Sequence, residues 1–167
     1  MNEDHELVRE AGELLTDAGA MVAAAESCTG GLLSSMLTNV PGSSAYFERG
    51  AVTYSNEAKV DLLGVDTAVL EREGAVSAPV ARQMARGVME SGGTAYGVST
   101  TGIAGPSGGT PEKPVGLVYV GVCTPDGAEV RELHIDRPRR KVKIRAATHA
   151  LNELRLALLN PGSGPRG

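Results

Sequence analysis

The sequence predicts an α/β protein, a three-layer α/β/α sandwich with a mixed, mostly parallel sheet. Helical and strand-like segments alternate through the first part of the chain, which is typical of parallel strands joined by crossover helices. Two β-prone runs follow, Val115–Cys123 and Glu129–Ile135, with a turn signal at Thr124–Gly127 between them. This hairpin adds an antiparallel strand. The length of 167 residues suits one domain with a sizeable core.

Apolar periodicity and capping residues place the remaining elements. Gly19 can end the first helix, Ser55 can cap a helix that Gly64 ends, and Ser77 with Pro79 can open another. We expect helices at about 3–18, 30–38, 55–64, 67–74, from 77 onward, and 140–159, and further strands at Met21–Ala25, Ala51–Tyr54 and Thr94–Ser99. The domain is expected to span 1–160, with a disordered tail at 161–167.

Composition excludes several classes of function. The net charge of −4 gives no general attraction to nucleic acid or anionic membranes. Cys28 and Cys123 are too few for a disulfide framework, and the scattered histidines lack zinc-ligand spacing, so we expect no metal and no cofactor. The acidic start is unlike a signal peptide, and no apolar run approaches the ~20 residues that span a bilayer. A cytoplasmic protein is expected, and a homodimer is one arrangement we consider.

The segment Ala25–Gly31 is the strongest candidate for a nucleophile turn. An apolar strand leads into it, an apolar helix leads out, and Ser27 falls where ligands of α/β sheets collect. A hydroxyl beside N–H groups uncovered by Gly30 and Gly31 is one way to build a hydrolase site. The structural alternative is that Ser27 or Thr29 only caps the following helix.

Lys59 is the candidate base for Ser27, because no histidine lies in a motif-like context. It stands near the start of the helix opened by Ser55, where the helix dipole and burial both favour a neutral amine. Ser–Lys hydrolases need such an amine. Tyr54 could orient Lys59 or relay a proton. The alternatives are a solvated surface lysine and a tyrosine in the core.

Three further features could bind substrate. Ser44 and Arg49 are expected near the same edge of the sheet as Ser27 and Lys59, where they could contact substrate. The glycine-rich loop Thr101–Thr110 could wrap a phosphate or a sugar or simply connect two elements. A basic cluster at the start of the last helix suits a phosphate, whereas its lack of interleaved aromatics disfavours nucleic acid. A solvated basic face is the other interpretation. The cluster consists of Arg137, Arg139, Arg140, Lys141, Lys143 and Arg145.

Several segments together resemble the CinA C-terminal domain family, whose enzymatic members are nicotinamide-mononucleotide amidohydrolases. The resemblance covers the folded region in order and implies a stand-alone domain, without the N-terminal molybdopterin-binding-like domain of longer members. The matching stretches are AESCTGG at Ala25–Gly31, GSSAYFERGAVTYSNEAK at Gly42–Lys59, GAVS at Gly74–Ser77, TGIAGP at Thr101–Pro106, GGT at Gly108–Thr110 and KPVGL at Lys113–Leu117.

The resemblance implies metal-free deamidation of nicotinamide mononucleotide to nicotinate mononucleotide and ammonia, in pyridine-nucleotide recycling. It assigns Ser27 as nucleophile, Lys59 as base and Tyr54 as an assisting hydroxyl. N–H groups of the Cys28–Gly31 turn would stabilise the oxyanion. The family has a substrate-contacting arginine near the start of the last helix, which Arg140 matches best, with Arg145 close behind. The expected substrate-binding residues are Thr29, Gly30, Gly31, Ser44, Thr101, Gly102, Ala104, Gly105, Arg140 and Arg145.

Other functions stay open at this point. The domain could be a non-catalytic, nucleotide-binding regulator linked to competence or the DNA damage response, because such roles are attached to the family name. It could also hydrolyse another pyridine or sugar-phosphate amide. Cys28 is a competing nucleophile next to Ser27. In each case the expected partner is a small nucleotide or related molecule, and neither nucleic acid nor membrane.

Overall fold

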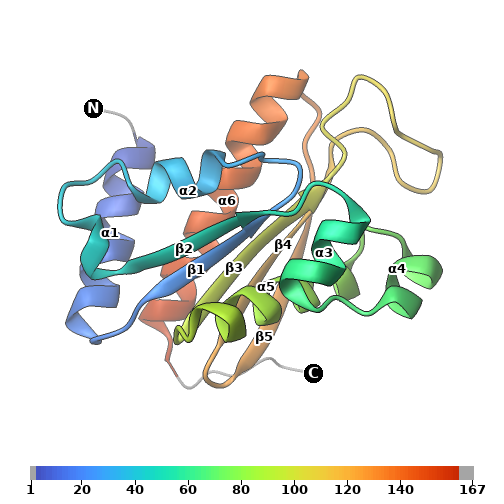
Figure 1. Ribbon diagram of the computed structural model, residues 1–167. Coiled ribbons are helices and arrows are strands. Elements are labelled where there is room, and N and C mark those ends of the chain that lie inside the picture. The colour runs from blue at the N-terminus through green and yellow to red at the C-terminus, as the bar shows by residue number, and fades with distance from the viewer. Residues whose placement is uncertain (1–2, 162–167) are drawn as a thin grey trace.

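The computed structural model describes residues 3–161, which form one sheet with helices on both of its faces (Figure 1). Within these residues the sheet has five strands in the order β2-β1-β3-β4-β5. The strands are β1 (Val22–Glu26), β2 (Phe47–Val52), β3 (Tyr96–Gly102), β4 (Leu117–Thr124) and β5 (Gly127–His134).

The strand directions confirm the predicted mixed sheet. β1 pairs in parallel with both β2 and β3, whereas β4 pairs antiparallel with both β3 and β5. β4 is therefore the one described strand that runs against the other four. The carboxyl ends of β1, β2 and β3 meet at one edge, where α/β proteins usually bind ligands.

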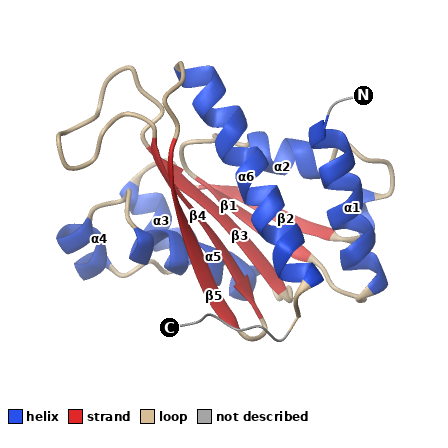
Figure 2. Cartoon of the chain, turned by 180° about the vertical axis from the view of Figure 1, so that it is seen from behind, coloured by secondary structure: helices blue, strands red, loops and turns tan. Residues whose placement is uncertain are grey.

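The helices make the two outer layers, as Figure 2 shows from behind. One layer holds α1, α2 and α6, which contact one another, and α6 packs on β3 and β4. The opposite layer holds α5, which packs on β1, β3 and β4, with α3 and α4 against it. The bounds are α1 (Glu3–Asp17), α2 (Leu32–Leu37), α3 (Asn56–Leu63), α4 (Thr67–Glu73), α5 (Ala78–Gly92) and α6 (Arg139–Leu159), with a short 3₁₀ turn, η1, at Ser43–Ala45.

The core is built from small aliphatic residues and lies on both faces of the sheet. All residues of β1 are buried, and they alternate between the layers: Val22 and Ala24 join the α1–α6 side, whereas Ala23 and Ala25 join the α5 side. A strand buried on both faces reads as a continuous apolar run. This is why β1 was predictable from the sequence.

Some predicted boundaries were wrong. The second strand was expected at Ala51–Tyr54, but β2 runs from Phe47 to Val52, because it is an edge strand whose charged residues imitate a loop. β3 extends to Gly102, so Thr101 and Gly102 lie in the strand rather than in the loop. Most of the predicted disordered tail falls at 162–167, outside the described residues. Among residues 3–161, no helix combines the length and apolarity needed to cross a bilayer.

Candidate active site

Ser27 stands directly after β1 at the carboxyl edge of the sheet. Its backbone N–H donates to Thr100 O of β3 at 3.0 Å. On the other side, the N–H of Thr53, which follows β2, donates to Glu26 O at 2.7 Å. The turn is thus fixed between the ends of two neighbouring strands. Ser27 is buried, with 9% of its accessible surface exposed.

Lys59 reaches Ser27 from the first turns of α3. Ser55 caps this helix, since its hydroxyl accepts from the Ala58 N–H at 3.0 Å. The Lys59 side chain is completely buried. Its Nζ lies 3.1 Å from Ser27 Oγ, 2.7 Å from Thr53 O and 3.4 Å from Tyr54 O. The structure therefore brings the predicted nucleophile and base into hydrogen-bond contact.

The surroundings of Lys59 suit a neutral amine. Two of its three partners are carbonyl oxygens, which can only accept, and a neutral amine has two hydrogens to give them. Lys59 Nζ can donate to Ser27 Oγ as an ammonium, whereas in the neutral amine the lone pair is left to accept the Ser27 hydroxyl proton. Burial lowers the pKa of Lys59, and among residues 3–161 no carboxylate forms an ion pair with it. This is the arrangement a general base requires.

Glu26 is a site residue that sequence reasoning missed. Its carboxylate is fully buried and accepts from the N–H groups of Gly31 at 3.2 Å, Leu33 at 2.8 Å and Ser34 at 2.9 Å. It also accepts from the hydroxyls of Thr29 at 2.6 Å and Ser34 at 2.7 Å. Glu26 thus holds the first turn of α2 and the loop after Ser27. The signal was a lone glutamate at the end of an apolar strand.

Hydrogen bonding narrows the choice of oxyanion donors in the nucleophile turn. The Gly30 N–H donates to Ser27 O at 3.1 Å, and the Gly31 N–H is bound to Glu26. Among residues 3–161, neither the Cys28 N–H nor the Thr29 N–H donates to a carbonyl, so these two remain the candidate oxyanion donors. The Thr29 hydroxyl donates to Glu26, so Thr100 donates to Thr29 across their 2.7 Å contact. Thr29 therefore offers a ligand its N–H rather than its hydroxyl.

Cys28 is poorly suited to act as the nucleophile. The residue is 6% exposed, and burial raises the pKa of its thiol to about 12. The thiolate, which is the reactive form, is scarce at neutral pH. Its side chain joins the apolar core beneath the turn. This favours Ser27 over Cys28 in the competition that the sequence left open.

A second group of contacts closes the site from the side of α6. The Arg139 guanidinium donates to Gly105 O at 2.8 Å and to the Tyr54 hydroxyl at 3.2 Å. These residues come from α6, from the loop after β3 and from the loop after β2. Arg139 therefore ties together three segments that surround Ser27 and Lys59.

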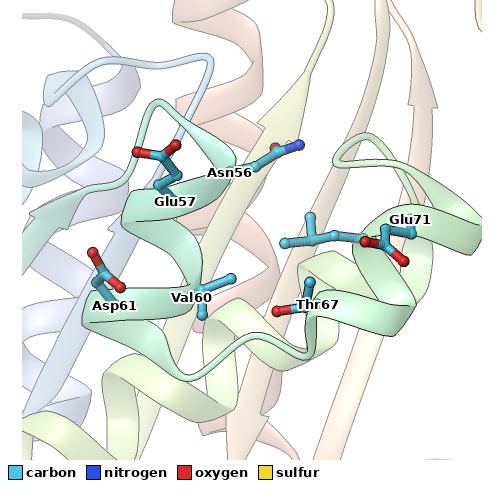
Figure 3. Close-up of a pocket in the computed structure, with 7 residues that line it drawn as sticks. Asn56, Glu57, Val60, Asp61, Thr67 and Glu71 are labelled. Atoms are coloured by element: carbon cyan, nitrogen blue, oxygen red, sulfur yellow. The ribbon is translucent and has the colours of Figure 1, made fainter.

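The hollow shown in Figure 3 is distinct from this site. It has a volume of about 540 Å³ and lies between α3 and α4. Lys59 belongs to the same helix but does not line it. Three carboxylates in the lining disfavour an anionic ligand there. The lining residues are Asn56, Glu57, Val60, Asp61, Thr67, Leu70 and Glu71.

Comparisons with known proteins agree with the fold and with the motifs. The family model of the CinA C-terminal domain matches residues 4–158. A CinA-like protein of Chlorobaculum tepidum is 58% identical over 141 residues, which cover 80% of this chain and 33% of that protein. A competence/damage inducible protein from Agrobacterium tumefaciens, solved by crystallography, has a TM-score of 0.91 and 42% identity, with 96% of this chain and 98% of that one covered.

This chain belongs to the CinA C-terminal domain family. A competence damage-inducible protein from Klebsiella pneumoniae gives the same fold, with a TM-score of 0.92, 31% identity and coverage of 96% of this chain and 99% of that one. The chain spans about a third of the length of the curated relatives it matches. It covers 33% of the Chlorobaculum tepidum protein and 28% of a CinA-like protein of Chlorobium limicola. What those longer proteins do as a whole is therefore a matter for proposal.

Ser44 lies far from the Ser27–Lys59 pair in this CinA domain. Ser44 lies in η1, before β2, whereas Ser27 follows β1. Since β1 and β2 are parallel, with Val22 opposite Phe47, Ser44 stands at the amino edge of the sheet. Ser44 and Ser27 of the same chain therefore lie at opposite edges of the sheet, and the expectation that they lie close together was wrong. Arg49 likewise pairs with its neighbour Glu48 and is turned to that ion pair.

The structure shows where the other residues predicted from the family pattern lie. The Tyr54 side chain is 62% exposed and contacts Arg139, so Tyr54 meets Lys59 only through its carbonyl. Arg140 and Arg145 are exposed, and within residues 3–161 neither forms a hydrogen bond or an ion pair. Arg139, rather than Arg140, contacts the two loops that border Ser27. α6 begins at Arg139, one residue earlier than predicted, and Arg139 and Arg140 point about 100° apart around the helix because they are consecutive.

The end of β3 and the loop that follows it contribute backbone more than side chains. The Thr101 hydroxyl donates to Ala75 O at 2.9 Å, and Ala104 is buried in the core. At Gly102, an added Cβ would lie 2.7 Å from Val118 Cγ2, so a glycine is needed for close packing. Of these predicted binding residues, Gly105 has the direct link to the site, through Arg139.

Proposed function

We propose that this CinA domain is an amidohydrolase that converts nicotinamide mononucleotide and water to nicotinate mononucleotide and ammonia. The observation that carries the proposal is the 3.1 Å contact between the buried Lys59 amine and the Ser27 hydroxyl. A hydroxyl nucleophile paired with a desolvated amine is the arrangement of Ser–Lys hydrolases. Family membership supports the choice of amide.

The first half of the proposed reaction acylates Ser27. Neutral Lys59 takes the hydroxyl proton as Ser27 Oγ bonds to the carboxamide carbon. The resulting oxyanion accepts hydrogen bonds from the Cys28 and Thr29 N–H groups, which donate to no carbonyl among residues 3–161. Lys59 then gives its proton to the amide nitrogen, the C–N bond breaks, and ammonia leaves.

The second half returns the enzyme to its starting state. Lys59, neutral again, takes a proton from water while the water oxygen bonds to the acyl carbon. The bond to Ser27 Oγ then breaks, and Lys59 returns the proton to that oxygen. The products are nicotinate mononucleotide and the free hydroxyl. The Lys59 bonds to Thr53 O and Tyr54 O keep the amine in place through both halves.

The charge around the site supports an anionic substrate. Arg139 lies beside the loops that border Ser27, and its planar guanidinium suits a phosphate. Within residues 3–161, this guanidinium has neutral oxygens as partners and no carboxylate. Its charge is thus available to a bound anion.

The direct test is ammonia release from nicotinamide mononucleotide by purified protein. The wild type is expected to turn over, while Ser27→Ala and Lys59→Ala lose at least about a thousandfold in kcat, as nucleophile and base variants of hydrolases do. Thermal melting of each variant controls for folding. If the wild-type protein releases no ammonia, the proposed function is wrong. If Ser27→Ala releases ammonia at the wild-type rate, the proposed mechanism is wrong.

A second candidate follows from the names of the relatives. Solved proteins of this fold are called competence or damage inducible, which favours a nucleotide-binding regulatory domain as the alternative. Such a domain would be stabilised against heat by the nucleotide and release no ammonia. The same two measurements therefore separate the candidates.

A further inference from the structure

Lys143 is a cation beside the nucleophile turn for which the catalytic steps give no role. A Cβ built on Gly30 would lie 3.7 Å from Lys143 Nζ, so the ammonium sits directly over the turn that follows Ser27. α6 packs against α2 and so places Lys143 there. The side chain is half-buried.

Lys143 has no partner of its own. Among residues 3–161 it forms neither a hydrogen bond nor an ion pair. Its charge nevertheless reaches into the site, because it lowers the pKa of the neighbouring Cys28 thiol against the larger effect of burial. A half-buried, unpaired ammonium beside the nucleophile turn is suited to form an ion pair with an anionic group of a bound ligand.

Arg139 and Lys143 act on the same side of α6. Residues four positions apart share a helix face, with their Cβ atoms about 6 Å from each other. Arg139 is held by Tyr54 and Gly105 on one side of the turn, and Lys143 stands over Gly30 on the other. An anion between these two cations would contact both while remaining beside Ser27.

We infer that Lys143 is a specificity-determining residue, which contacts the phosphate of the substrate together with Arg139 and makes the site prefer a phosphorylated amide over its dephosphorylated form. The inference rests on the proposed function for the identity of the amide. It assigns the phosphate to one named lysine among the basic residues of α6. Arg140 and Arg145, which are exposed and unpaired, are left to solvent.

The test compares nicotinamide mononucleotide with nicotinamide riboside, which lacks the phosphate. Binding is measured by calorimetry in a Ser27→Ala background, and kcat/KM by ammonia release in the wild-type background. Lys143→Met keeps the methylenes without the charge, and Lys143→Arg keeps the charge. Lys141→Met is the matched control: it removes an exposed lysine two positions away, about 200° around the same helix.

Lys143→Met is expected to weaken binding of the mononucleotide by about tenfold, the size of one charge-assisted contact, and to leave the riboside unchanged. Lys143→Arg should restore most of the preference, and Lys141→Met should stay within about twofold of its parent, as exposed charges usually do. Melting temperatures of the folded variants should agree. An unchanged preference in Lys143→Met overturns the inference, and so does an equal loss for both ligands.

The outcomes also separate this inference from the proposed function. If the protein prefers the mononucleotide through Lys143 but releases no ammonia, the amidohydrolase fails and the phosphate contact stands. If ammonia is released from both amides equally, the amidohydrolase stands and the phosphate contact fails. A Lys143→Met protein that melts earlier with an intact preference would show that Lys143 has only a structural role, which overturns the inference.

Discussion

Lys59 Nζ and Ser27 Oγ lie 3.1 Å apart, although 32 positions separate the two residues. The parallel register of β1 and β2 explains this, because Glu26 is paired with Val52 at the last step of the ladder. Ser27 leaves the sheet one residue after Glu26, and α3 begins shortly after Val52. The same arrangement buries the Lys59 amine against two carbonyls. Sheet register therefore sets both the distance and the desolvation that the base needs.

The pH dependence of turnover tests the state of Lys59. Burial lowers the pKa of Lys59 from its ordinary value of 10.5, and only the neutral amine can accept the Ser27 proton. Below the lowered pKa the amine is protonated and inactive, so kcat/KM should rise with pH, with a slope of about one on a logarithmic plot, and level off above that pKa. The profile is measured as ammonia release in buffers of constant ionic strength.

Lys59→Arg is the control for this profile. Arginine keeps its proton throughout the accessible range, so the variant should be inactive at every pH. A kcat/KM that stays level from acid to alkaline pH with no rising limb, or that falls as pH rises, would contradict the assignment of Lys59 as base.

Cys28 should be dispensable. Cys28→Ser is expected to keep about half or more of the wild-type kcat, because a buried thiol with a pKa of about 12 does no nucleophilic work at neutral pH. Iodoacetamide at pH 8 should alkylate Cys28 slowly in the native protein and quickly after denaturation, as mass spectrometry of the tryptic peptide would show. Rapid inactivation of the native enzyme by this reagent would reinstate the thiol as a nucleophile.

Glu26 should matter for both stability and turnover. Glu26→Gln places an amide where N–H and hydroxyl donors already converge, so at least one buried donor loses its acceptor. We expect a loss of about 2 kcal/mol in the free energy of unfolding, measured by urea denaturation, and a fall in kcat as the nucleophile turn loosens. Glu48→Gln, on exposed β2, should leave kcat unchanged. Full stability in Glu26→Gln would show that the carboxylate does not hold the turn.

The sequence was informative wherever chain order determines position in the sheet. Ser27 and Lys59 could be paired because adjacent parallel strands end at one edge. Ser44 was misplaced by the same reasoning, since it precedes β2, and six residues at about 3.3 Å each carry the chain to the opposite edge. Ser44 belongs to the same matching stretch of sequence as Lys59, and this closeness in the sequence did not reveal that the two residues lie at opposite edges of the sheet.

The basic residues of α6 could not be assigned from sequence for a different reason. When cations follow one another in the sequence, their order does not show which face of the helix turns toward the site. That orientation decides which of Arg139, Arg140 and Lys143 faces the site. Glu26 was missed because most of its partners are backbone N–H groups, and the sequence pattern does not show where the backbone of a turn runs. The three-dimensional structure was needed for both.

Tyr54→Phe separates two roles for the tyrosine hydroxyl. In the structure the hydroxyl accepts a hydrogen bond from Arg139, while the contact of Tyr54 with Lys59 runs through the backbone carbonyl, which phenylalanine keeps. The variant should therefore raise KM for nicotinamide mononucleotide by a few-fold, about the effect of one lost hydrogen bond, and leave the midpoint of the pH profile in place. Arg139→Lys, which loses the planar fork, should raise KM in the same direction. A shifted midpoint or a large fall in kcat with KM unchanged would mean that the hydroxyl assists proton transfer, as the family pattern had implied.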